Sequence, residues 1–141
     1  MTVSTPGIRQ DLDPSDWSHH RFGLSEAGWR RLSGRRFVVT GAGTGFGRAF
    51  ATAIGLADAK VVLAGRRLEP LRESREAGQA LGAKPGRFEC EPMDINDPAD
   101  VVEVMGRIAA AGPLHGIVAN AAVPQGNGGP TPLLSSDESE W

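Results

Sequence analysis

The residues most suited to chemistry lie in the stretch Thr40–Gly47, which reads TGAGTGFG. Glycines allow a tight turn and let backbone N–H groups approach an anion closely. An apolar run, Phe37–Val39, precedes the stretch, and apolar residues at three- and four-residue steps follow it. A strand that enters a glycine turn and leaves as a helix can bind phosphate, because the helix N-terminus adds partial positive charge. We therefore predict a nucleotide site rather than a plain structural turn, with these candidate residues: Gly41, Gly43, Thr44, Gly45, Phe46 and Gly47.

A second candidate group follows the apolar run Lys60–Ala64, where the sequence continues Gly65-Arg66-Arg67. Dinucleotide sites for NAD usually carry an acidic residue here, which holds the ribose hydroxyls. Glycine occupies that place, and two guanidinium groups follow that can pair with the 2′-phosphate of NADP. We therefore predict NADP(H) in preference to NAD(H). The alternative is that Arg66 and Arg67 are solvated side chains at the start of the next helix.

Two further candidate groups come at the ends of later strands. Asp94-Ile95 follows the third strand, and the Asp94 carboxylate could accept a hydrogen bond from an adenine amino group or form a local turn. Asn120-Ala121-Ala122 closes the fourth strand, where an Asn can bridge backbone groups and line a cofactor cleft, or merely start a loop. Spacing alone leaves both pairs of alternatives open.

The elements that must position these residues alternate between strand and helix. Apolar runs predict strands at 35–40, 60–64, 87–92 and 114–121, the last with its core at Ile117-Val118-Ala119. Helices are expected at 45–57, from about Pro70 to Gly82, and from Asp97-Pro98 onward, where Asp is the N-cap. The apolar face of the last helix is expected to contain Val101, Val102, Met105, Ile108 and Ala109.

This alternation predicts an α/β fold, a Rossmann-type three-layer αβα arrangement around a parallel sheet. Right-handed crossovers favour the strand order 3-2-1-4, truncated after the fourth strand. The winding reverses between strands 1 and 4, where ligands bind in such sheets. We expect a nucleotide-binding half-domain, incomplete, at 32–141, preceded by a partly irregular extension at 1–31.

The flanking segments give weaker signals. Ser25 is expected to cap a short helix ending near Leu32. His19-His20 has no second ligand pair at a suitable spacing, so no metal site is predicted. A loop rich in Pro and Gly is expected at 124–132, and a capping box of Ser135 and Glu138 could start another helix.

Composition excludes several classes of function. The formal net charge of the 141 residues is -2, so nothing favours nucleic acid as a partner. No apolar run approaches the length of a membrane span, and the N-terminus does not resemble a signal peptide. Cys90 is the only cysteine, so no internal disulfide is possible, which fits a reducing compartment. It lies in a predicted strand and is expected to be a small core residue rather than a nucleophile. We therefore expect a cytoplasmic protein.

Taken together, these residues resemble the short-chain dehydrogenase/reductase family over about residues 32–141. Thr40-Gly41, with Gly45-Phe46-Gly47 three residues on, matches its cofactor motif, and Gly65-Arg66 is similar to its NADP-preferring variant. Asp94 matches its adenine-contacting Asp. Asn120-Ala121-Ala122 is similar to its Asn-Ala-Gly motif, with Ala122 in place of the glycine. The resemblance implies NADP(H)-dependent reduction of a small-molecule carbonyl, or oxidation of a secondary alcohol, by hydride transfer.

The resemblance also implies catalytic residues that these 141 residues lack. The family uses a Ser and a Tyr-xxx-Lys pair beyond the fourth strand, and this sequence contains no tyrosine. We predict that no catalytic residue is present, that the chain alone is inactive, and that a homo-oligomer is expected only of a full-length enzyme. Two alternatives are a non-catalytic NADP(H)-binding module and an inert truncated product.

Overall fold

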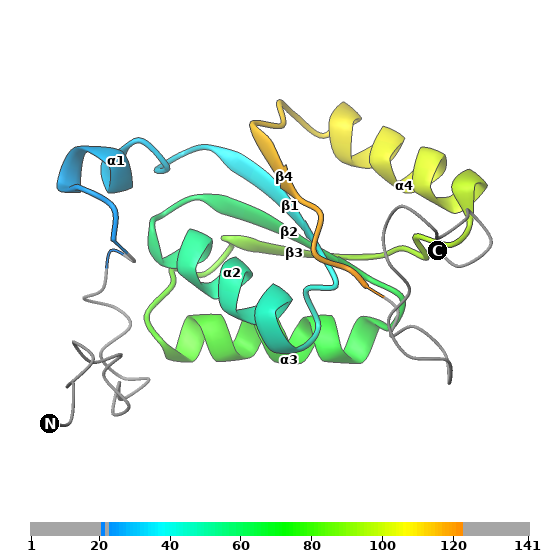
Figure 1. Cartoon of the computed structure of the whole chain (residues 1–141), viewed down its shortest axis with the longest axis horizontal. Helices are drawn as coiled ribbons and strands as arrows, with labels where there is room; N and C mark the ends of the chain where they lie inside the picture. Colours follow the sequence, from blue (N-terminus) through cyan, green and yellow to red (C-terminus); the bar gives the residue numbers. More distant parts are fainter. Residues whose placement is uncertain (1–20, 22, 123–141) are drawn as a thin grey trace, which may run out of the picture.

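The computed structural model of the chain describes residues 21 and 23–122 (Figure 1). The histidine pair, the 124–132 loop and the capping box of Ser135 and Glu138 lie outside the described residues, as does most of the expected extension. A short helix, α1 (Glu26–Arg30), comes first, and its N-cap Ser25 accepts a hydrogen bond from the Gly28 backbone as predicted.

Four parallel strands form one sheet in the order β3-β2-β1-β4, which confirms the predicted topology. The strands are β1 (Arg36–Thr40), β2 (Lys60–Gly65), β3 (Phe88–Pro92) and β4 (Gly116–Val118). Their register pairs Val38 with Val62 on one side and with Ile117 on the other. The fourth strand is shorter than the predicted 114–121 segment.

Helices cover both faces of the sheet (Figure 1): α2 (Gly45–Leu56) and α3 (Leu68–Ala80) lie on one face, and α4 (Pro98–Ala110) lies on the other. The strands alternate their side chains between two cores. Val39, Val61 and Leu63 pack with Ala51 of α2 and Leu71 of α3. On the opposite face, the buried residues come together as one cluster: Val38, Val62, Ala64, Met93, Val104 and Ile108. Strand β2 is therefore buried on both faces, as its unbroken apolar run predicts.

Helix α2 buries small residues and exposes both of its phenylalanines, and helix α4 buries part of its predicted apolar face. Helix α2 buries Gly47, Ala51, Thr52 and Gly55, whereas Phe46 is 79% exposed and Phe50 44% exposed. Helix α4 buries Val104 and Ile108, but Val102 is 73% exposed and Ala109 is also exposed. In β4, Ile117 is 55% exposed, and Ala119 is exposed and lies outside the strand. In α4, Val101, Met105 and Ile108 pack in the cluster as predicted, whereas Val102 and Ala109 do not.

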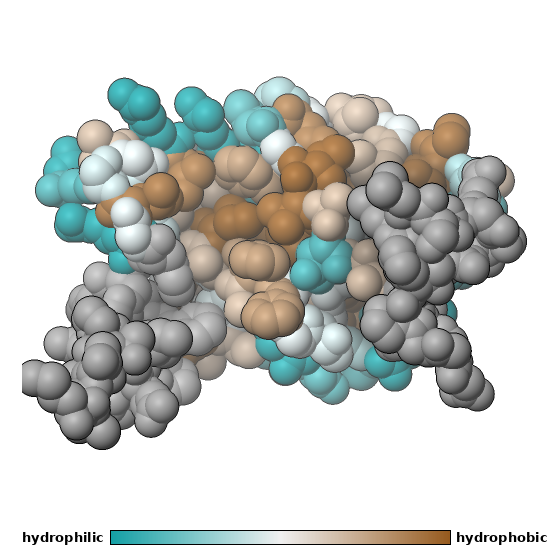
Figure 2. All heavy atoms as spheres, viewed as in Figure 1, coloured by the Kyte–Doolittle hydropathy of each residue, from teal (hydrophilic) through white to brown (hydrophobic). Residues whose placement is uncertain are grey.

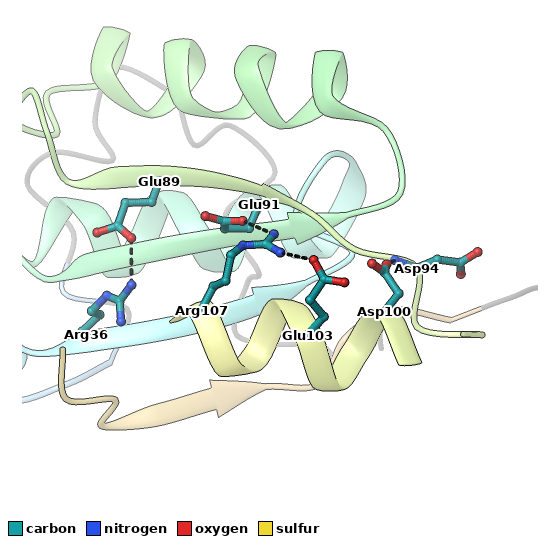
Figure 3. A network of polar contacts seen from close by, with 7 residues as sticks. All are labelled: Arg36, Glu89, Glu91, Asp94, Asp100, Glu103 and Arg107. Atoms are coloured by element: carbon teal, nitrogen blue, oxygen red, sulfur yellow. Dashed lines mark hydrogen bonds and ion pairs between the residues drawn. The ribbon is translucent and has the colours of Figure 1, made fainter. Parts of the chain in front are cut away.

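A buried arginine holds α4 against the sheet. Arg36 of β1 is 7% exposed, and its guanidinium donates to the Ile108 carbonyl at 2.5 Å near the C-terminal end of α4. The same group pairs with Glu89 of β3 at 2.8 Å (Figure 3). Its charge thus has a carboxylate partner and also lies at the negative end of a helix dipole.

Cys90 of β3 lies partly buried beside the core formed with α2 and α3. Burial raises the pKa of its thiol, which keeps the sulfur protonated and unreactive near neutral pH. Among the described residues, no helix is both long and apolar enough to cross a membrane.

Candidate functional site

A cleft of about 360 Å³ opens where the carboxyl ends of the strands meet. Its volume falls within the range of roughly 300–1,000 Å³ that is usual for small-molecule sites. The winding of the sheet reverses at this point, because β2 and β4 pair with opposite edges of β1. The predicted site residues that line it are Gly41, Gly43, Thr44, Gly45, Phe46, Arg66, Arg67, Ile95, Asn120, Ala121 and Ala122.

The glycine turn lies between β1 and the N-terminus of α2, as predicted. Thr44 is the N-cap residue but makes no capping hydrogen bond with its side chain, and the first turn of α2 contains no acidic residue. Gly45 has a φ of +52°, and the space where its side chain would be is open for 4 Å. The first turn of α2 therefore keeps its backbone donors and its partial positive charge available to an anion in the cleft.

Gly47 does not line the cleft and has a different role. A Cβ atom built there would lie 2.0 Å from the Gly41 carbonyl oxygen and 2.7 Å from the Asn120 Nδ2. The residue at this position must be glycine, because α2 passes directly under the turn that precedes it. Gly47 thus allows α2 to pack closely against the turn without contacting the cleft.

Thr40 connects the glycine turn to the end of β4. Its hydroxyl oxygen accepts hydrogen bonds from the backbone N–H groups of Asn120 and Ala121, each at 3.0 Å. The Asn120 side-chain amide donates to the Thr40 carbonyl at 3.1 Å. Asn120 therefore bridges backbone groups, one of the two roles considered for it, and also lies on the wall of the cleft.

Arg66 and Arg67 begin the opposite wall. Both side chains are exposed, and Arg67 is the N-cap of α3. Neither forms an ion pair with any of the residues that the structure describes. Two positive charges thus face solvent at the rim of the cleft, which suits them to an incoming phosphate.

Asp94 lies beside the cleft but does not line it. One oxygen of its carboxylate accepts from the Asn96 backbone at 3.0 Å, the turn-forming role considered for it. Its own N–H donates to the Asp100 carboxylate at 2.6 Å, which fixes the turn to the start of α4 (Figure 3). Ile95 and Asn96 then form this part of the wall.

Gly65, which the sequence places beside the arginine pair, also lines the cleft, and four further residues of the lining were missed by sequence reasoning: Pro70, Leu71, Met93 and Asn96. Each is adjacent or close in sequence to a predicted site residue. Pro70 and Leu71 follow the arginine pair within one helical turn, and Met93 and Asn96 flank Asp94-Ile95. Closeness in sequence to the predicted site residues could have identified these four, whereas their side-chain chemistry could not.

Comparison with known proteins gives a consistent result. A family model described as short chain dehydrogenase matches residues 35–141. A probable oxidoreductase of Streptomyces antibioticus is 44% identical over 95 residues, which cover 65% of this chain and 30% of that protein. The short-chain dehydrogenase/reductase VdtF of Byssochlamys spectabilis is 38% identical over 100 residues, which cover 70% of this chain and 31% of VdtF. The chain thus spans about a third of the length of these curated relatives.

Among solved structures, a metagenomic short-chain oxidoreductase in complex with NADP superposes with a TM-score of 0.61. It is 34% identical in sequence, and the match covers 78% of this chain and 48% of that one. The fold therefore has a parallel in a protein crystallised with NADP.

Proposed function

Since this chain belongs to the short-chain dehydrogenase family, we propose that it is the cofactor-binding part of an NADP(H)-dependent oxidoreductase. The observation that carries the proposal is the cleft at the switch point, where the glycine turn, the arginine pair and the Asn120–Ala122 segment converge. A complete enzyme would reduce a carbonyl or oxidise a secondary alcohol. Residues 32–141 would form the binding domain, residues 1–31 an extension of it, and the cytoplasm its location.

The residues present fit a dinucleotide with a phosphate at each of two places. The uncapped start of α2 and the open space beside Gly45 suit the diphosphate. At the rim, Arg66 would hold the 2′-phosphate, with Arg67 in support, and no carboxylate occupies the Gly65 position. This arrangement favours NADP(H) over NAD(H), because an acidic residue there would repel the 2′-phosphate.

The remaining candidates would hold the two ends of the cofactor. Ile95 would contact the adenine, and Asp94 would reach it with the carboxylate oxygen that is not bonded to Asn96. Asn120, Ala121 and Ala122 would line the nicotinamide side, held in place by Thr40. When bound, the nicotinamide supplies the hydride donor or acceptor, and the chain's own part is to bind and orient it.

The test is a titration of the chain Met1–Trp141 with NADPH and NADH. We expect NADPH to bind at least tenfold more tightly, roughly the effect of one charge-assisted contact. Replacing both Arg66 and Arg67 by Ala should remove that preference while leaving NADH binding in place. The matched control Arg107→Ala, an arginine of α4 paired with Glu91 and Glu103, should leave both affinities unchanged. Equal affinities of the parent chain for NADPH and NADH would contradict the 2′-phosphate role.

A second candidate function is a non-catalytic module that binds NADP(H). The described residues include those proposed for the adenine and diphosphate sites, whereas the 141 residues contain no tyrosine for acid–base chemistry. Both candidates predict that these 141 residues bind NADPH without turnover, so they are distinguished by whether a Ser and a Tyr-xxx-Lys pair follow Trp141 in the natural chain.

A further inference from the structure

The carbonyl groups of the glycine turn are held by side chains from two helices. Ser74 of α3 is 2% exposed, and its hydroxyl donates to the Ala42 carbonyl at 2.7 Å. The same hydroxyl oxygen accepts from the Arg48 Nε at 2.9 Å. Ser74 also lies 3.0 Å from the Pro70 carbonyl, a longer contact that would compete for its single proton.

Arg48 of α2 adds a second contact to the turn. Its terminal nitrogen donates to the Gly43 carbonyl at 2.6 Å and also pairs with Glu73 at 3.2 Å. One planar guanidinium therefore bonds the turn, a buried hydroxyl and a carboxylate at once. The Arg48 side chain is 34% exposed, and Glu73 is 58% exposed, so the ion pair itself faces solvent.

These contacts determine which way the peptide groups of the turn point. In a trans peptide the N–H points opposite to the C=O of the same unit. The Ala42 and Gly43 carbonyls point toward Ser74 and Arg48, so the N–H groups of Gly43 and Thr44 point the other way. Gly43 and Thr44 both line the cleft, where donors directed at an anion bind it.

The same contacts fix the distance between the two expected phosphate positions. Helix α3 carries Arg67 as its N-cap, and its first turn packs directly on the glycine turn. A Cβ atom on Gly43 would lie 2.8 Å from the Pro70 Cβ, so the two segments touch without a gap. A shift of α3 relative to the turn would therefore move the arginine pair relative to the diphosphate donors.

We propose that Arg48 and Ser74 are positioning residues for the dinucleotide. They direct the N–H groups of the glycine turn into the cleft and lock the turn to the helix that carries Arg67. The inference rests on the proposed function, because the two residues position a site for the dinucleotide. Neither residue would touch the cofactor itself.

The binding experiment compares variants of Met1–Trp141 by NADPH titration. Ser74→Ala removes the hydroxyl's bonds to the Ala42 carbonyl and from Arg48. Arg48→Lys keeps the charge but replaces the planar guanidinium, which bonds Ser74 and Gly43 through separate nitrogens, with a single ammonium. We expect each to weaken NADPH binding by about tenfold, the usual loss for one buried hydrogen bond. Glu73→Gln, which removes only the exposed ion pair, is the control and should bind like the parent. If Arg48→Lys binds like the parent while Arg48→Met does not, charge rather than position matters, and the proposal is wrong.

A measurement without cofactor separates positioning from general stability. Backbone order parameters from nitrogen-15 relaxation should fall at Gly43 and Thr44 in both variants, from about 0.85 toward the flexible range below about 0.6. The values at Val62 and Leu63, in the buried strand β2, should not change. A general loosening of the folded structure would instead lower the values at both pairs of residues. Should Ser74→Ala not fold, Arg48→Lys on the half-exposed side of α2 carries the same test.

The two proposals fail in different ways. If the parent chain does not bind NADPH, the proposed function is wrong, and the order parameters alone decide the positioning role. If the parent binds, but Ser74→Ala and Arg48→Lys bind equally well with a rigid turn, the positioning role is wrong and the cofactor proposal stands.

Discussion

At the scale of single residues, the glycine turn combines positions with different physical demands. Gly45 needs a positive φ and has open space beside it, whereas Gly47 has no room for any side chain. Both positions are glycine in the motif TGAGTGFG. Only the surrounding structure shows that Gly45 is required by backbone conformation and Gly47 by the close approach of neighbouring atoms. Asp94 is similar, since its carboxylate forms a turn with Asn96 while its neighbour Ile95 lines the cleft.

Gly47→Ala should be strongly destabilising, because the new methyl group would collide with the Gly41 carbonyl at 2.0 Å. Overpacking of this kind costs roughly 1–3 kcal/mol or more, and here it would also displace the turn and weaken NADPH binding. Urea unfolding and NADPH titration measure the two effects. Gly106→Ala in α4 is the matched control: nothing lies within 4 Å of the added methyl, and helix propensity should raise stability by about 1 kcal/mol. Parent-like unfolding of Gly47→Ala would contradict the packing described.

At the scale of elements, one aspartate joins three connections at the amino ends of the strands. Asp58, in the turn between α2 and β2, accepts from Ser33 before β1 and from Arg87 before β3. Lys84 pairs with the same carboxylate at 3.1 Å. The hydrogen bond from Lys84 is the largest cause that lowers the pKa of Asp58, and Arg87 and Ser33 lower it further against partial desolvation.

A lowered pKa in the folded state predicts how stability depends on pH. The contribution of Asp58 is complete above its unfolded pKa of roughly 3.9 and is lost as pH falls through the lower folded value. The free energy of unfolding should therefore fall less steeply below pH 4 in Asp58→Asn than in the parent. Asn suits the variant because it tolerates the φ of 64° found at this position. Urea unfolding at a series of pH values measures the slopes, and identical slopes would refute the assignment.

At the scale of the whole molecule, we expect cofactor binding to be separable from catalysis. Figure 2 shows hydrophobic surface gathered on the face where α2 and β4 lie. On these two elements, the side chain of Phe46 is 79% exposed and that of Ile117 is 55% exposed. The residues proposed to hold phosphate all lie within 41–67, whereas the 141 residues contain no tyrosine.

We therefore expect Met1–Trp141 to bind NADPH without reducing a carbonyl compound. The physical reason is that orientation of the cofactor does not supply the proton that carbonyl reduction requires. NADPH oxidation followed at 340 nm with a panel of ketones and aldehydes measures this, with a complete short-chain reductase as the positive control. Sustained turnover by the pure chain would show that another group performs the acid–base step.

The sequence by itself determined the alternation of strands and helices, the order of the sheet and the glycine turn at the switch point. The elements and the turn follow from local patterns, namely apolar runs, caps such as Ser25 and Asp97, and glycines, and the order of the sheet follows from the handedness of the crossovers. Only the tertiary structure decided which apolar residues of α2 and α4 stay exposed, how Asp94 turns, and that Arg48 reaches Ser74, 26 residues away. Local patterns specify backbone conformation, because neighbouring residues interact in every conformation of the chain. Contacts between distant side chains depend on how the elements pack, which no short stretch of sequence contains.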